Sequence, residues 1–246
     1  MATFVLVHGG AHGGWCYQRV ARILRSAGHD VYTPTMTGLG ERAHLVGADV
    51  DLDLHISDIA AVLHYEDLRD VILVGHSYGG MVITGVADRA TDRIGRLVYL
   101  DAATPVNGLS LVGVAGPIIE AVRPDGKVID GVETVLLPSP DAALLYGVTD
   151  PDDMAWMAER LTGHPWRCFE QPLELTNEAA MLAIPRYHIV CTSTLASRDP
   201  ELVANARAEG RLWDIDTGHD LMITEPEAVA DRLLRVASDQ APIVQP

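Results

Sequence analysis

The most informative feature of the chain is the pentapeptide Gly75-His76-Ser77-Tyr78-Gly79, which follows an apolar run at residues 71–74 and leads into a helical stretch at residues 80–87. A G-x-S-x-G pattern between a strand and a helix is typical of the nucleophile elbow, a strained turn that lifts one serine hydroxyl above a sheet. Glycine is required on both sides of the serine because larger side chains would collide with the neighbouring strand and helix. The pattern therefore predicts Ser77 as a nucleophile at the edge of a sheet.

Strand-like and helix-like segments alternate along most of the chain. Apolar residues recur at helical spacing in residues 18–27, 54–65, 80–87 and 226–237, whereas short apolar runs typical of strands span residues 4–7, 31–33, 71–74, 97–100, 187–191 and 212–215. Buried strands that alternate with helices form a mostly parallel sheet with helices on both faces. The expected fold class is therefore α/β.

Residues 104–185 interrupt this alternation with prolines, short amphipathic pieces and no strong strand. We interpret this insertion between two core strands as a helical cap over the active site. Residues 1–103 and 186–239 then form the core, and residues 240–246 a flexible tail.

Large apolar side chains of the cap either line a pocket beneath it or form the cap's own core. The residues concerned are Met154, Trp156, Met157, Leu161, Trp166 and Phe169. From this set we assign Met154, Trp156 and Trp166 to substrate binding, together with Ala11 of the first loop.

Composition limits the partners of the chain. With 246 residues, of which 48% are hydrophobic, the chain can form one large domain with a sizeable core. A net charge of −16 argues against nucleic acid or an anionic membrane as a partner, and no apolar run reaches membrane-spanning length. Scattered cysteines and the absence of a signal-peptide pattern indicate a cytoplasmic protein with reduced thiols. The expected partner is a small molecule, and the sequence does not indicate an oligomeric state.

A nucleophilic serine needs a base, and His219 is the best candidate among the ten histidines. It lies just after the last strand-like run and before the last helix, so its loop emerges at the same sheet edge as Ser77. His76 lies inside the elbow and is expected to be structural, while His44 and His164 could reach a cleft. None of the histidines shows metal-ligand spacing, so we expect neither a metal ion nor an organic cofactor.

The acid that orients the base has two candidates, Asp101 and Asp199. Asp101 ends the strand-like run 97–100, which holds its side chain at the same edge of the sheet. Asp199 is the first acid after the run 187–191 but is separated from it by a Ser/Thr-rich loop. The sequence favours Asp101, and Asp199 stays as the alternative.

Two backbone N–H groups are expected to form an oxyanion hole. One belongs to Tyr78, directly after the nucleophile, and the other to Gly10 in the glycine-rich loop 8–15. The competing interpretation of this loop is a phosphate cradle. It lacks both the G-x-G-x-x-G pattern and the Lys-Ser/Thr of a P-loop, which argues against that interpretation.

Taken together, these motifs resemble those of the α/β-hydrolase superfamily, and in particular small bacterial esterases allied to plant methylesterases and hydroxynitrile lyases. The resemblance covers nearly the whole chain and rests on the loop from His8-Gly9 to Trp15, on Gly38-Leu39-Gly40, on the elbow and on Gly218-His219. It implies Ser77 as nucleophile, His219 as base, and the amides of Gly10 and Tyr78 as the oxyanion hole. The chain departs from the group after Cys191, where the group usually has Asp.

Some bacterial members of this group hydrolyse xenobiotic esters and carbamates, so the resemblance implies a serine hydrolase for small apolar esters or activated carbamates. Hydroxynitrile lyases have Thr in place of Gly9 and Lys in place of Asp220, which argues against cyanohydrin cleavage. Epoxide hydrolases and haloalkane dehalogenases of this fold need Asp at the elbow, where this chain has Ser77, which argues against both activities. The remaining alternative is a ligand-binding protein that keeps the triad but has little turnover.

Overall fold

A six-stranded parallel sheet forms the centre of the computed structural model, which describes residues 1–238. The predicted tail 240–246 lies outside the described residues. The strand order is β2-β1-β3-β4-β8-β9. The strands are β1 (Thr3–Val7), β2 (Asp30–Tyr32), β3 (Val71–His76), β4 (Ile94–Leu100), β8 (Arg186–Cys191) and β9 (Leu212–Ile215). The predicted parallel sheet is confirmed, and each strand contains or overlaps one of the predicted runs.

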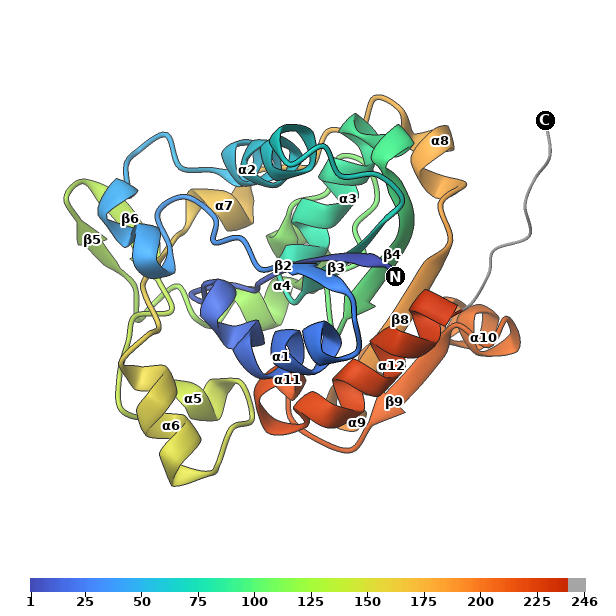
Figure 1. The fold of residues 1–246 in the computed structure, drawn as a ribbon. Helices are drawn as coiled ribbons and strands as arrows, with labels where there is room; N and C mark the ends of the chain where they lie inside the picture. The colour runs from blue at the N-terminus through green and yellow to red at the C-terminus, as the bar shows by residue number, and fades with distance from the viewer. Residues whose placement is uncertain (239–246) are drawn as a thin grey trace.

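Helices cover both faces of the sheet (Figure 1). On one face lie α2 (Leu52–Tyr65) and α3 (Gly79–Arg89), and on the other α1 (Gln18–Ser26) and α12 (Pro226–Ser238). Successive strand residues point to opposite faces. Leu73 of β3 therefore joins the hydrophobic cluster on the α2–α3 side, and its neighbour Ile72 joins the cluster on the α1–α12 side.

Local chemistry sets where these helices begin and end. The Asp51 side chain accepts a hydrogen bond from the N–H of Leu54 and caps α2. Gly28, just after α1, has a φ of +85°, a conformation that glycine adopts without strain. The shorter core elements are η1 (Gly14–Tyr17), η2 (Gly40–Leu45), η3 (Thr91–Arg93), α9 (Thr192–Leu195), α10 (Pro200–Ala208) and α11 (Leu221–Thr224). Within residues 1–238, no helix combines the length and apolar character that crossing a membrane requires.

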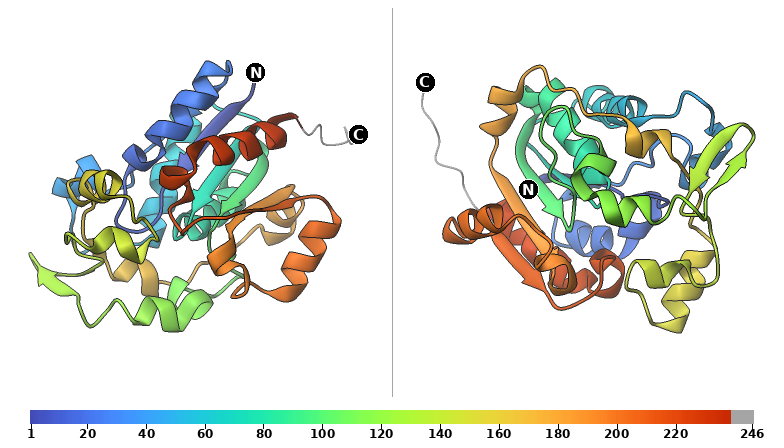
Figure 2. Two further views of the ribbon diagram at one scale, coloured as in Figure 1. Left: turned by 90° about the horizontal axis from the view of Figure 1, so that it is seen from below. Right: turned by 180° about the vertical axis from the view of Figure 1, so that it is seen from behind.

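The insertion between β4 and β8 contains strands as well as helices, unlike the purely helical cap expected from the sequence. Its helices are α4 (Leu111–Glu120), α5 (Ala142–Leu145), α6 (Pro151–Ala158), α7 (Arg167–Glu170) and α8 (Glu178–Leu182). Its antiparallel strands are β5 (Lys127–Ile129), β6 (Val132–Val135) and β7 (His164–Pro165). The β5–β6 hairpin projects from the body of the molecule (Figures 1 and 2).

A turn at Asp130-Gly131 explains the hairpin. Both residues have positive φ, +49° and +82°, as a tight two-residue hairpin turn requires. Asp-Gly between short runs of β-branched residues is a recognised hairpin signal, so the sequence did contain the information that predicts these strands.

Candidate active site

The elbow holds Ser77 in a strained conformation between β3 and α3. Its φ is +53°, which is uncommon for a residue with a side chain and typical of functional turns. A Cβ on Gly75 would lie 2.5 Å from the carbonyl oxygen of Gly79, and one on Gly79 would lie 2.8 Å from the carbonyl oxygen of His8. The turn therefore requires glycine at both positions, as the sequence motif predicts.

The structure brings Ser77, His219 and Asp101 into one hydrogen-bonded chain. His219 Nε2 lies 2.9 Å from Ser77 Oγ, and His219 Nδ1 lies 2.5 Å from Asp101 Oδ2. Because an ionised carboxylate only accepts hydrogen bonds, His219 donates from Nδ1 and its Nε2 lone pair faces the serine hydroxyl. This is the arrangement that lets an imidazole remove a proton from a serine.

Asp101 lies at the C-terminal end of β4, and its carboxylate is fully buried. It accepts hydrogen bonds from Arg198 at 2.6 Å, from the Thr194 hydroxyl at 2.5 Å and from the N–H of Cys191 at 3.2 Å. Burial opposes ionisation, but His219, Arg198 and Thr194 outweigh it and hold the pKa of Asp101 well below its ordinary value. Burial also lowers the pKa of His219, but the facing carboxylate outweighs this and raises it.

Asp199, the alternative acid, has a different role in the structure. Its exposed carboxylate accepts hydrogen bonds from the N–H groups of Glu201 and Leu202 and caps α10. The geometry therefore places Asp101, and not Asp199, against His219.

A cavity of about 680 Å³ opens next to Ser77 and His219, and Gly10 and Tyr78 line it as well. Within residues 1–238, the N–H groups of Gly10 and Tyr78 donate to no protein acceptor, so both are available to a bound oxygen atom. The remaining polar lining residues are Asp125, Lys127, Ser139 and Tyr146. The apolar lining residues are Leu111, Ile118, Ile119, Ala121, Val122, Leu136, Leu137, Pro138, Leu145 and Phe169.

The four residues that the sequence assigned to substrate binding do not line this cavity. Trp166 is 2% exposed in the cap core, and Trp156 packs edge-on against Trp15. Met154 lines a separate shallow surface site, and Ala11 is fully buried within the first loop. These assignments are corrected: large apolar side chains of the cap mostly pack with each other or with the core.

Of the six apolar cap residues considered from the sequence, Phe169 alone lines the cavity. Most of the remaining apolar wall comes from α4, its flanking residues and the segment after β6, which sequence reasoning missed. The signal available was the dense apolar stretch 111–122, broken by Pro117.

A second cavity of about 620 Å³ lies away from this site, between the sheet and α8 and α10. Tyr99, Arg186 and His188 line it, and neither Ser77 nor His219 does. Among the described residues that line it, none has the hydrogen-bonding partners of an activated nucleophile, so we assign the chemistry to the first cavity.

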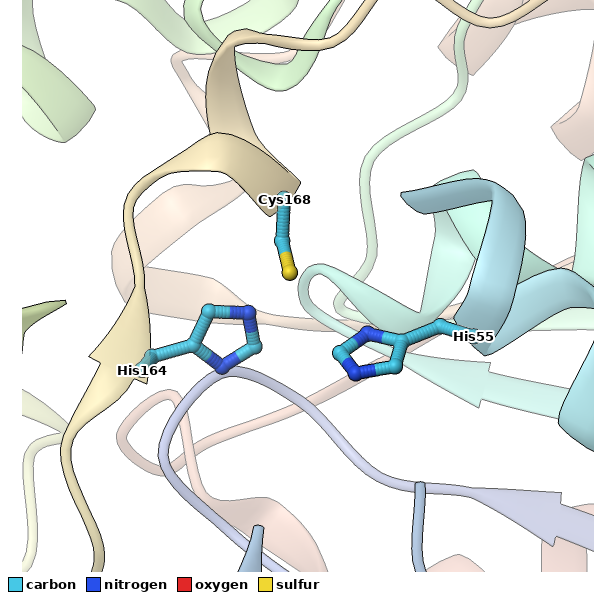
Figure 3. A group of neighbouring side chains, drawn as sticks. All are labelled: His55, His164 and Cys168. Carbon is cyan, nitrogen blue, oxygen red and sulfur yellow. The ribbon is translucent and has the colours of Figure 1, made fainter. Parts of the chain in front are cut away.

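A buried group of possible metal ligands lies behind Tyr78. Ligand atoms of His55, His164 and Cys168 lie within 4.8 Å of one another, and the Cys168 sulfur points between the two rings (Figure 3). His164 of β7 and Cys168 of α7 are close in the sequence, but His55 of α2 is far from both, so ligand spacing alone did not reveal the group.

Existing hydrogen bonds argue against a metal ion in this group. The Tyr78 hydroxyl donates to His55 Nδ1 at 2.9 Å, and the N–H of Ala11 donates to His164 Nδ1 at 3.2 Å. Burial raises the pKa of the Cys168 thiol, which disfavours the thiolate that a metal needs. His164 Nε2 has no partner in the described structure and could bind a metal ion. The ion would, however, have to displace the Tyr78 hydroxyl from His55 Nδ1. We interpret the group as support for Tyr78 and the first loop.

Comparison with known proteins establishes the family. Residues 4–232 match the family model described as the alpha/beta hydrolase family. The chain belongs to this family. It is 40% identical to a carbendazim hydrolyzing esterase from Nocardioides sp. (strain SG-4G), over 95% of this chain and 98% of that protein. It is 26% identical to methylesterase 2 of Arabidopsis thaliana, over 96% of each chain.

Solved structures agree with this assignment. An extracellular alpha/beta-hydrolase from a Paenibacillus species superposes with a TM-score of 0.76 at 25% identity, covering 96% of this chain and 98% of that chain. With the esterase relatives, the family membership identifies this chain as a carboxylesterase-type hydrolase.

Proposed function

We propose that the chain cleaves small, uncharged, mostly apolar carboxylic esters or activated carbamates through an acyl-enzyme on Ser77. The observation that carries the proposal is the hydrogen-bonded chain from Ser77 through His219 to Asp101 at the floor of a largely apolar cavity. The 40% identity to a carbendazim hydrolyzing esterase supports carbamates as one substrate class.

In the proposed mechanism, His219 accepts the hydroxyl proton of Ser77 at Nε2 while Oγ bonds to the carbonyl carbon. The carbonyl oxygen becomes an oxyanion that the N–H groups of Gly10 and Tyr78 stabilise. His219 then protonates the leaving alcohol oxygen as its bond to carbon breaks. Water, deprotonated by the same nitrogen, attacks the acyl-enzyme and releases the acid and free Ser77.

The cavity favours uncharged substrates. Most of its wall is apolar, and the opposite charges of Asp125 and Lys127 offset each other. A substrate carboxylate or phosphate would therefore lose its hydration without gaining a dedicated partner.

We expect kcat/KM for p-nitrophenyl butyrate to exceed that for the anionic p-nitrophenyl succinate by at least about tenfold, because an unpaired charge pays the larger desolvation penalty. A panel of neutral esters, carbendazim, an amide and a lactone, with anionic esters of matched size, measures this preference. A best substrate that is a dicarboxylate or phosphorylated ester would contradict the proposed class.

Two alternatives give different outcomes in the same assay. A ligand-binding protein that keeps the triad but has little turnover would not release p-nitrophenol from the ester in a burst. The hydrolase should release one p-nitrophenol per active site in such a burst. A hydroxynitrile lyase would cleave cyanohydrins, but position 220 is Asp, and this Asp is fully buried against His12. The burst is expected for the hydrolase and for neither alternative.

Dialysis against EDTA should leave kcat/KM for p-nitrophenyl butyrate unchanged. The oxyanion N–H groups supply the electrophilic help that a metal ion would otherwise give, and the ligand atoms of the His55–His164–Cys168 group are largely engaged or protonated. The measurement is the rate before and after dialysis, with metal content determined in parallel. A loss of rate that added zinc restores would show that a metal ion takes part.

A further inference from the structure

A fully buried hydrogen-bonded pair, His12 and Asp220, joins the first loop to the loop of His219. His12 Nε2 lies 2.8 Å from Asp220 Oδ2, and neither side chain is exposed. His12 comes two residues after Gly10, and Asp220 directly follows His219. Because well-packed apolar residues often replace a buried ion pair without loss of stability, stability alone does not account for its presence.

Both ring nitrogens of His12 face acceptors. Nδ1 lies 2.7 Å from the carbonyl oxygen of Gly10, and Nε2 faces the carboxylate of Asp220. A carbonyl and an ionised carboxylate only accept hydrogen bonds, so the ring satisfies both when it carries two protons. Burial opposes the ionisation of Asp220, but the facing His12 outweighs it and lowers the pKa of Asp220. The geometry thus places Nδ1 to donate to the Gly10 carbonyl and Nε2 against the carboxylate of Asp220.

Imidazole rings hold Gly10 on both sides. His8 Nδ1 donates at 2.9 Å to the carbonyl oxygen of Gly9, which belongs to the peptide unit that carries the N–H of Gly10. His12 Nδ1 donates to the carbonyl oxygen of Gly10 itself. Glycine is otherwise free to rotate about both dihedrals. These two bonds therefore fix the direction of the Gly10 N–H that lines the cavity.

The loop that contains His219 and Asp220 contacts both the cap and the elbow. The backbone N–H of Asp220 donates to the carbonyl oxygen of Tyr146 in the cap at 2.9 Å, and the Tyr146 hydroxyl lies 3.5 Å from the Gly10 carbonyl oxygen. His76 of the elbow donates from Nε2 to the carbonyl oxygen of His219 at 3.0 Å. A displacement of Asp220 would thus be transmitted both to the oxyanion donor and to the base.

We propose that His12 and Asp220 are positioning residues for the oxyanion hole, and that they act through the carbonyl of Gly10. This rests on the proposed function, in which the Gly10 N–H binds the oxyanion. Removing an oxyanion donor costs about 10²- to 10³-fold in kcat. Loss of the His12 bond misplaces the donor without removing it, so we expect kcat to fall by about 10- to 100-fold. KM should change by less than about threefold, because the interaction strengthens mainly in the transition state.

Variants at both positions test the link. His12→Gln places its amide nitrogen near Asp220 but removes the imidazole donor from the Gly10 carbonyl, which within residues 1–238 keeps only the longer contact with the Tyr146 hydroxyl. Asp220→Leu removes the hydrogen-bond partner of His12 Nε2, which holds the ring in place. Both should lower kcat by about 10- to 100-fold per active site, counted by the p-nitrophenol burst, at nearly unchanged KM. Asp220→Asn can donate to Nε2 of a neutral His12, whose Nδ1 stays on Gly10, and should recover most of the kcat lost in Asp220→Leu.

A stability control separates positioning from folding. Val229→Ala creates a cavity in the fully buried core of α12, so it should lower the melting temperature and leave kcat per active site unchanged. If His12→Gln and Asp220→Leu behave in the same way as this control, the pair is only structural and the proposal is overturned. A kcat loss in Asp220→Asn equal to that in Asp220→Leu would likewise exclude action through the Gly10 hydrogen bond.

Nitrogen NMR of the wild-type protein tests the pair even if the variants do not fold. The ring of His12, assigned through its contacts with the rings of Trp15 and Tyr146, should carry a proton on Nδ1, the nitrogen that faces the Gly10 carbonyl. A ring with no proton on Nδ1 could not donate to the Gly10 carbonyl and would overturn the proposal. A wild-type protein that gives no burst would contradict the proposed function, while the NMR signal would still decide the state of the pair.

Discussion

Replacing Ser77 by alanine should lower kcat for a neutral p-nitrophenyl ester by about 10⁶-fold, as in dissected triads that lose the nucleophile. The physical reason is that the hydroxyl 2.9 Å from His219 Nε2 forms the covalent bond to the acyl group. Alanine has the same backbone preferences as serine at a φ of +53°, so the elbow should keep its shape. Steady-state kinetics gives kcat, and mass spectrometry of the quenched reaction detects the acyl adduct in the wild type alone.

Ser139 provides the matched control, because it is the other serine that lines the cavity. Its hydroxyl bonds to no histidine within residues 1–238, so nothing there activates it. Ser139→Ala should change kcat by less than about tenfold, the scale of one neutral hydrogen bond. A Ser77→Ala protein that keeps more than a tenth of wild-type activity would refute the acyl-enzyme mechanism.

The sheet and its helices could be predicted because their signals are local. The apolar run 71–74 and the glycines of the elbow place β3 and α3 without any knowledge of the rest of the chain. His219 and Asp101 could be selected because the C-terminal ends of parallel strands share one edge of a sheet. The same reasoning misses Arg198, whose contact with Asp101 depends on how the segment between α9 and α10 folds back.

The cavity wall could not be predicted, because it is decided by packing between segments far apart in the sequence. Trp166 and Trp156 are the large apolar side chains that a pocket would use, yet they stabilise the cap by contacts with other aromatic rings. The pair of His12 and Asp220 also joins distant segments and leaves no pattern in the sequence. The sequence thus predicts features with local signals, whereas contacts between segments distant in the sequence are seen only in the structure.

Asp101→Asn should lower kcat by about 10⁴-fold, the effect of the same change in the best-studied triad. The carboxylate fixes the tautomer of His219 through the 2.5 Å bond to Nδ1 and stabilises the imidazolium formed during attack. An amide can donate to Nδ1 and leave the ring proton on Nε2. A protonated Nε2 cannot accept the hydroxyl proton of Ser77. Because Asp101 raises the pKa of His219, its loss should lower that pKa. The acidic limb of the residual kcat/KM profile should therefore move to lower pH.

Asp199→Asn is the matched control for the same chemical change. Asparagine caps helices about as well as aspartate, so α10 should keep its cap, and both kcat and the melting temperature should stay near wild type. Circular dichroism and thermal melting of both variants show whether a loss of activity reflects unfolding, which matters because Asp101 also binds Arg198 and Thr194. If Asp199→Asn abolished turnover while Asp101→Asn stayed near wild type, His219 would be oriented by Asp199. The helix cap at α10 would then have to open during the reaction to bring that carboxylate to the imidazole.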